Sequence, residues 1–191
     1  MAKDYTLRLS IESADQYKQY LEEITFDWAR TSDNIGYHFT YLHYLYQVHS
    51  QVSLPPYKMI DALRIKTIII ELASIAELLL FDAICNLSVV DEWGRKTYLM
   101  LDPKVGFTVI LAYAYQHKVI NKDLKGRLHK LFELRHMVHL THGGRDPDQF
   151  TTSLLKDSEK TVEDLVKHFL TTRRRGRINI DASELPFPWK K

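Results

Sequence analysis

The chain has 191 residues, of which 45% are hydrophobic and 26% are charged, so it is long enough to bury the core of one globular domain. Its formal net charge of +2 excludes a global electrostatic attraction to nucleic acid and leaves a local basic patch as the electrostatic route. The only cysteine, Cys85, excludes an internal disulfide and a cysteine-based zinc site, and its apolar neighbours predict a buried thiol without a redox role.

The scarcity of helix-breaking residues favours long helices, because the chain contains only 7 glycines and 6 prolines. We predict an all-α helical bundle of about five to six helices with an up-and-down core. The sequence reads as a single domain over residues 1–191. We divide it into an N-terminal helical extension (1–56), a bundle (57–175) and a tail (176–191).

The location of the protein is predicted from its apolar segments. The N-terminus lacks the apolar core of a signal peptide. The most apolar stretch, residues 68–85, carries Glu71, Glu77 and Asp82, and three acidic groups are too costly in a segment exposed to lipid. We therefore expect a cytoplasmic protein without a membrane partner.

The N-terminal third predicts two helices separated by a break. Residues 1–12 alternate as a short extended segment does, and Ser13 is typical of the cap of a helix that runs to Trp28. Residues 31–36 predict a break or kink. A second amphipathic helix then places Tyr37, Tyr41, Tyr44, Leu45 and Val48 at helical spacing. Tyrosines on such a stripe typically lie at the edge of a core or an interface, and base stacking is the alternative.

The middle of the chain predicts its longest helix, from Tyr57 to about Leu87. This helix is apolar on most faces, so it is either central in its bundle or shared with a second chain. Residues 88–103 predict a polar connection. A short helix over residues 106–118 follows, with Val109, Ile110 and Tyr113 expected to point inward.

The C-terminal half predicts two more helices. Asn121 is expected to cap the first, which carries Leu124, Leu128 and Leu131 and stops before Gly143 and Gly144. The second runs from about residue 150 to residue 174. The tail after it contains too much proline to continue the helix.

The segment from Glu133 to His142 carries the chemistry. Arg135, His139 and His142 lie at i, i+4 and i+7, which places them within about 40° of one another on a helix and on the stripe of the preceding leucines. His136 points about 100° away from Arg135. This face either emerges into solvent at the helix end, where cations are favourable, or lines a cleft. A guanidinium beside an imidazole could clamp a phosphate and move protons, as metal-free RNA cleavage requires.

Two further patterns have competing interpretations. Glu133 and His136 form one Glu-x-x-His half-motif, but a di-iron site needs a second one and the chain has none, so we expect no metal cofactor. The basic run Arg173, Arg174 and Arg175 is either a solvated helix end or a set of phosphate contacts.

The segment Leu131–Leu140 resembles the signature of the HEPN family, an Arg followed by a polar residue and then by a His. The resemblance covers about residues 60–170, with Glu71 and Glu77 on a helix like the family's long leading helix. It makes Arg135 the family Arg and His136 the polar second position. His142, separated from Arg135 by six residues, fits the usual spacing, whereas His139, separated from it by three residues, fits the local order of residues, Arg-polar-x-Val-His-Leu.

The resemblance implies a homodimer and a metal-independent endoribonuclease of the kind found in toxin–antitoxin, phage-defence and RNA-processing systems. Catalytic roles would fall to Arg135, His139 and His142, and RNA and an antitoxin-type protein would be partners. The alternative is a non-catalytic helical module that binds a protein or a nucleotide through the same dimer cleft.

Overall fold

The structure is a computed structural model that describes residues 14–22, 24–25, 29–51, 58–90, 96–98, 104–139, 150–173 and 187–190. The helices in these ranges are α1 (Ala14–Leu21), α2 (Ala29–Gln51), α3 (Lys58–Cys85), α4 (Phe107–Gln116), α5 (Lys122–His139) and α6 (Thr152–Arg173). An antiparallel hairpin joins β1 (Ser88–Val90) to β2 (Lys96–Tyr98), and a short 3-10 helix, η2, spans Pro188–Lys190. The predicted all-α fold class is confirmed.

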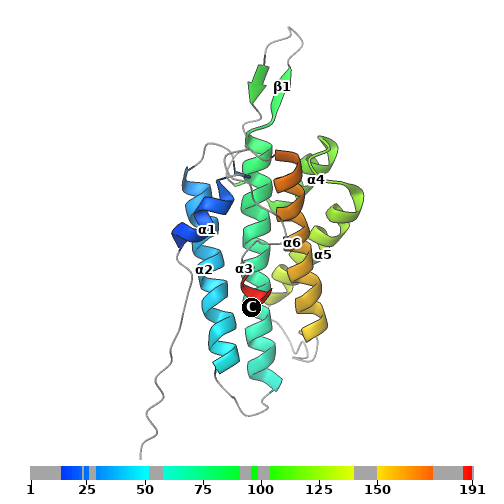
Figure 1. Ribbon diagram of the computed structural model, residues 1–191. Coiled ribbons are helices and arrows are strands. Elements are labelled where there is room, and N and C mark those ends of the chain that lie inside the picture. The colour runs from blue at the N-terminus through cyan, green and yellow to red at the C-terminus, as the bar shows by residue number, and fades with distance from the viewer. Residues whose placement is uncertain are drawn as a thin grey trace, which may run out of the picture.

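The longest helix, α3, lies at the centre of the bundle and packs against α2, α4, α5 and α6 (Figure 1). Its leucines, isoleucines and alanines are good core residues, and Ile68, Leu72, Ile75 and Leu79 are fully buried. The chain descends through α2 and ascends through α3 and α6 in this view, so the core is up-and-down. The central position accounts for the buried apolar faces of α3.

Side-chain caps start the two C-terminal helices. The backbone N–H of Leu124 donates to Asn121 Oδ1 at 2.8 Å, which confirms the predicted cap of α5. Thr151 Oγ1 accepts from the backbone N–H of Leu154 at 3.2 Å at the start of α6. The leucines of α5 at positions 124, 128 and 131 are buried, as predicted.

The predicted break at residues 31–36 is wrong, because α2 runs through it without interruption. Tertiary contacts hold this polar stretch in the helix: Ile35 is fully buried and Lys18 of α1 forms a 2.6 Å ion pair with Asp33. The Thr40 hydroxyl also donates to the backbone carbonyl of Gly36 at 2.9 Å. Weak local helix propensity is thus overridden by packing.

The first helix is shorter than predicted, since α1 ends at Leu21 instead of near Trp28. The backbone N–H groups of Ile24 and Thr25 both donate to the Leu21 carbonyl, which turns the chain and still buries Ile24. Trp28 and the predicted extended segment at residues 1–12 lie outside the described residues.

The tyrosines of α2 lie apart from its core face, and on α4 the predicted inward position of Val109 is wrong whereas that of Ile110 is confirmed. Tyr37, with 65% of its surface exposed, and its neighbours Tyr41 and Tyr44 point to solvent, because the core face of α2 carries Ile35, Phe39 and Leu42 instead. On α4, Val109 is 44% exposed while Phe107, Ile110, Leu111 and Ala114 are buried. On α4 the apolar stripe lies about one residue, or 100°, from the predicted one, whereas on α2 the core face lies two residues, or about 160° around the helix, from the tyrosine stripe.

Three features of the connections and termini differ from the predictions or were not predicted. The polar connection at residues 88–103 contains the β1–β2 hairpin, which projects from the end of α3 (Figure 1). Cys85 is half-buried and not fully buried. The C-terminal Phe187 is buried against α2, with its ring centroid 6.4 Å from that of Phe39.

No described helix is both long enough and apolar enough to cross a membrane.

Candidate functional site

Arg135 continues the buried stripe of α5 at the point where that stripe reaches the surface. Leu128 and Leu131 are buried, whereas 28% of the Arg135 side chain is exposed. Helical geometry places Arg135 about 40° from Leu131, so the guanidinium is directed along the edge of the α3–α5 contact. This is the position that the sequence predicts for it.

Two contacts hold the guanidinium of Arg135 in place. Its Nη1 donates to Glu77 Oε2 on α3, which forms an ion pair between residues far apart in the sequence. Its carbon Cζ lies 5.3 Å from the centroid of the Phe132 ring, a cation–π distance. Phe132 is itself stacked on Phe107 of α4 with centroids 4.0 Å apart. Arg135 is therefore oriented by α3 and, through Phe132, by α4.

His136 points away from the Arg135–Glu77 ion pair, as the helical spacing predicts. His136 is exposed and meets Phe132 edge-on, with ring centroids 4.6 Å apart, and it does not take part in the ion pair with Glu77. Glu133, its partner in the Glu-x-x-His half-motif, faces His129 instead at 3.5 Å. Within the described residues, no three His, Cys, Asp or Glu side chains are placed to hold a metal ion.

Glu71 forms a second ion pair on α3, with a residue that sequence reasoning missed. His38 Nδ1 of α2 lies 2.5 Å from Glu71 Oε2. Nothing in the sequence pairs these residues, which come from different helices. Because Glu71 and Glu77 are six residues apart, they are separated by roughly 9 Å along α3 and 120° around it. One carboxylate of α3 therefore contacts the His38 imidazole of α2 and the other contacts the Arg135 guanidinium of α5.

A partly exposed stripe of α3 lies between the two ion pairs. It contains Leu63, Thr67, Ile70 and Ser74, of which Leu63 is 54% exposed and the others are half-buried. The helical register places this stripe between the directions of Glu71 and Glu77. Although α3 is central, it thus leaves one face only partly covered, with Arg135 at one edge. We call this face the α3 stripe.

The remaining predicted site residues have no described side chains. His139 is the last residue of α5, one turn beyond Arg135, and Arg173 is the last residue of α6. His142, Arg174 and Arg175 lie outside the described residues. The common stripe of Arg135 with His142, the choice between the two histidines and the phosphate contacts of the basic run all stay predictions.

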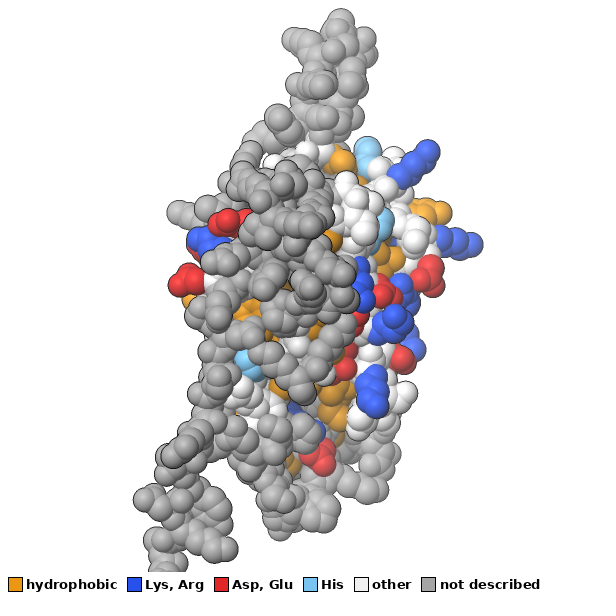
Figure 2. Space-filling view, viewed as in Figure 1, with side chains coloured by type: hydrophobic (Ala, Val, Ile, Leu, Met, Phe, Trp, Pro, Cys, Tyr) orange, Lys and Arg blue, Asp and Glu red, His pale blue; other side chains and the backbone are white. Residues whose placement is uncertain are grey.

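The described surface has mixed charge on the side that Figure 2 shows. Lys and Arg side chains are interspersed with Asp and Glu along the right edge of the view (Figure 2). Among the described residues, Arg127 pairs with Asp164 at 2.6 Å. On this face the described residues therefore create no large field of one sign, so an anion would have to be recognised by local contacts.

Away from the Arg135–Glu77 pair, a polar cluster built around Tyr46 connects α2 with α6 and with the 3-10 helix η2. The hydroxyl of Tyr46 on α2 donates to Glu159 Oε1 on α6, and the Tyr46 ring lies 6.3 Å from that of Trp189. Burial raises the pKa of Tyr46, and the hydrogen bond to Glu159 adds to that shift. Burial also raises the pKa of Glu159 above its ordinary value, although the Tyr46 hydroxyl opposes the shift. Burial lowers the pKa of nearby Arg64.

The raised pKa of Glu159 predicts that its ionisation destabilises the fold. As the pH rises above about 4.5, the Glu159 carboxyl loses its proton in the unfolded chain before it does in the folded one. The free energy of unfolding therefore falls with rising pH until the pH exceeds the higher pKa of the folded state. Glu159→Gln keeps an acceptor for Tyr46 and should become more stable than the wild type towards neutral pH, by up to about 1 kcal/mol after solvent screening. Urea unfolding at pH values from acidic to neutral checks this. A parallel pH dependence of the wild type and Glu159→Gln would contradict the assignment.

The resemblance of the C-terminal part of α5 to the HEPN signature rests on residues 131–140 and on the helices around them. Of these residues, the structure describes the side chains from Leu131 to Met137, including the oriented guanidinium. Comparisons of the chain with protein-family models, with curated proteins and with solved structures found no match.

Proposed function

We propose that this chain is a HEPN-like RNA-binding protein of the cytoplasm and a metal-independent endoribonuclease of a defence or toxin–antitoxin system. One observation carries the proposal: the partly exposed guanidinium of Arg135 is fixed by Glu77 and Phe132 on the helix that ends at His139. A fixed cation near histidines is the minimum that phosphoryl transfer needs without a metal.

The ion pair with Glu77 is compatible with phosphate binding. A guanidinium has five N–H donors, and Glu77 accepts from the Nη1 atom alone. The remaining donors can form a bidentate pair with two phosphate oxygens. Because Glu77 also cancels much of the charge of Arg135, the RNA would be recognised by the geometry of these hydrogen bonds more than by long-range attraction.

In the proposed mechanism a histidine, His139 or His142, removes the proton of a ribose 2′-hydroxyl. The 2′-oxygen then bonds to the adjacent phosphorus and the bond from phosphorus to the 5′-oxygen breaks. A second histidine, which a partner chain could supply, protonates that 5′-oxygen. Arg135 stabilises the extra negative charge on the phosphoryl oxygens. Arg173, Arg174 and Arg175 would contact phosphates further along the RNA.

The activity is tested on the purified full chain with RNA in the presence of a chelator. Cleavage should persist without metal and leave 2′,3′-cyclic phosphate and 5′-hydroxyl ends. DNA of the same sequence should survive because it lacks the 2′-hydroxyl. Failure of the wild type to cleave a diverse set of RNAs would count against the nuclease.

We further propose that two copies associate through α2 and the α3 stripe. Five of the seven large apolar side chains that are exposed in the described part of the chain belong to α2 and α3: Tyr37, Tyr41, Tyr44, Ile60 and Leu63. Exposed apolar side chains on two neighbouring helices are able to form an interface. A two-fold contact there would bring two copies of Arg135 to the same cleft.

The dimer has a direct test by light scattering at micromolar concentration. The wild type should have the mass of two chains, whereas Tyr41→Glu and Leu63→Glu should shift it to one chain because each buries a charge in the contact. Val109→Glu, which places the same charge on an exposed position of α4, should remain dimeric. A monomeric wild type, or a monomeric Val109→Glu variant, would be the contrary result.

A non-catalytic module is the second candidate, and one observation favours it. Arg135 already has a carboxylate partner, and the exposed tyrosines of α2 offer aromatic surface suited to a protein partner such as an antitoxin. Such a module would bind its partner with unchanged affinity after His139→Ala and His142→Ala, and it would leave RNA intact.

A further inference from the structure

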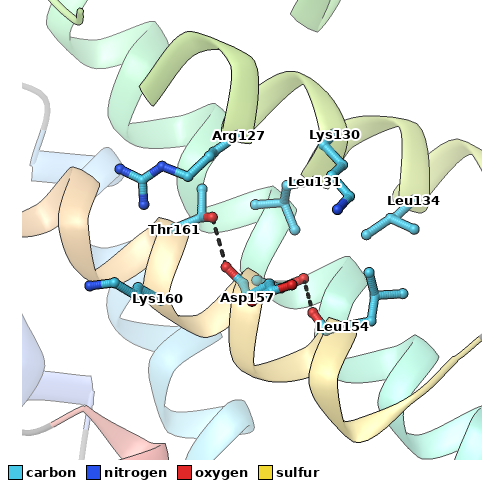
Figure 3. A pocket seen from close by; sticks show the side chains of 9 residues that line it. Arg127, Lys130, Leu131, Leu134, Leu154, Asp157, Lys160 and Thr161 are labelled. Atoms are coloured by element: carbon cyan, nitrogen blue, oxygen red, sulfur yellow. Dashed lines mark hydrogen bonds between the residues drawn. The ribbon is translucent and has the colours of Figure 1, made fainter. Parts of the chain in front are cut away.

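A cavity of about 320 Å³ lies between α5 and α6, away from the candidate site. Figure 3 shows that α5 forms one wall, with Lys130 and Leu134, and that α6 forms the opposite wall, with Leu154 and Asp157. Leu134 points about 100° away from its neighbour Arg135 around α5. The cavity and the Arg135–Glu77 pair therefore occupy different flanks of the same helix.

The inner surface of this cavity combines apolar contact with hydrogen-bond acceptors. Leu131 and Leu134 are buried and Leu154 is half-buried. The hydroxyls of Ser158 and Thr161 are also buried, and they donate to the backbone carbonyls of residues 154 and 157 at 2.8 and 2.7 Å (Figure 3). Because their protons are used, these two oxygens can only accept hydrogen bonds from a ligand.

Two of the three cations that line the cavity are already engaged. Arg127 donates to Asp123 through Nε at 3.1 Å and to Asp164 through Nη1 at 2.6 Å. Lys160 lies 3.4 Å from the second oxygen of Asp164. Their charges are balanced by these carboxylates, so they contribute little net attraction for an anion.

Lys130 and Asp157 are the charged lining residues that remain. Neither forms an ion pair with another described residue, although they stand on opposite walls of one cavity (Figure 3). The cavity thus offers a cation on one side, an anion on the other and leucines between them. A ligand that complements it carries both charges and an apolar body.

We propose that this cavity binds a small zwitterion with an apolar side chain, namely an apolar α-amino acid. Its carboxylate would pair with Lys130. Its ammonium would donate to Asp157 and to the hydroxyl oxygens of Ser158 and Thr161. Its side chain would pack on the leucines. The volume lies at the lower end of the range of ligand pockets, roughly 300–1,000 Å³, which suits a single amino acid.

Calorimetric titration of the full chain with L-phenylalanine tests the proposal. Three analogues separate the parts of the ligand: N-acetyl-L-phenylalanine lacks the ammonium, L-phenylalaninamide lacks the carboxylate, and glycine lacks the apolar side chain. L-phenylalanine should bind, and each analogue should bind about tenfold more weakly, since one charge-assisted hydrogen bond or one apolar group is lost.

Matched variants place the binding in this cavity. Lys130→Gln and Asp157→Asn should each weaken L-phenylalanine binding about tenfold, because each removes one charge and keeps a hydrogen-bonding group. Lys122→Gln, at an exposed lysine of α5 that does not line the cavity, should bind as the wild type does. All these residues are exposed, so the fold should tolerate the substitutions.

Three results would overturn the proposal. These are no binding of L-phenylalanine at millimolar concentration, equal binding of the N-acetyl analogue, and equal weakening by Lys122→Gln. The second result would show an anion site instead of a zwitterion site. Because the assay uses no RNA, it is independent of whether Arg135 serves a nuclease.

Discussion

Replacing Arg135 with alanine should lower RNA cleavage by roughly 100- to 1,000-fold, the usual cost of losing one donor that stabilises transition-state charge. The structure provides the reason, since the guanidinium is partly exposed and held by Glu77 and Phe132. Arg135→Lys should recover only part of the rate, because an ammonium keeps the charge but lacks the planar fork. Single-turnover cleavage of one RNA by each variant provides the measurement.

Two further variants separate catalysis from folding. Arg135→Ala leaves Glu77 without its partner, which itself costs stability. The double variant Glu77→Gln with Arg135→Gln removes both charges and lets two amides hydrogen-bond, so it should fold well and still fail to cleave. His136→Ala, on the same helix but away from the pair, should have a small effect. Thermal melts accompany each assay, and cleavage that persists in a folded Arg135→Ala variant would refute the site.

The same assay decides which histidine moves the proton. His142→Ala is expected to abolish cleavage on the spacing of the HEPN signature, whereas loss with His139→Ala would select the shorter spacing. A proton shuttle between two groups should produce a bell-shaped dependence of the rate on pH. A rate that is flat through neutral pH would contradict general acid–base catalysis by histidine.

Truncating the centre of the bundle should have the largest effect on stability. Phe169 of α6 is the largest fully buried side chain in the described part of the chain. Phe169→Ala removes its apolar contacts and leaves a cavity that the surrounding helices can only partly fill, which should cost about 3–5 kcal/mol. Urea unfolding followed by circular dichroism gives the free energy directly.

Val109 provides the control for this measurement. It was predicted to point inward, yet it is 44% exposed on α4. Val109→Ala should therefore change the free energy of unfolding by less than about 0.5 kcal/mol. A cost comparable to that of Phe169→Ala would mean that Val109 is buried, either in the chain or in an assembly.

The sequence by itself determined the helical class, the long helix α3 and the two C-terminal helices. Their apolar residues recur with the helical period, and the cap at Asn121 is a local interaction between residues close in the chain. The burial of Leu124, Leu128 and Leu131 followed from the same stripe, as did the position of Arg135 at its end. Such features depend on neighbours within one or two helical turns.

Tertiary structure alone decided which helices face one another. The pairs Arg135–Glu77 and His38–Glu71 join different helices, and no local spacing predicts them. The continuity of α2 through residues 31–36 also depends on α1 and on the burial of Ile35. The exposure of the α2 tyrosines has the same origin, because more than one face of α2 carries apolar residues and the neighbouring helices select the face that is buried. Periodicity reports which residues share a face, whereas packing decides what that face meets.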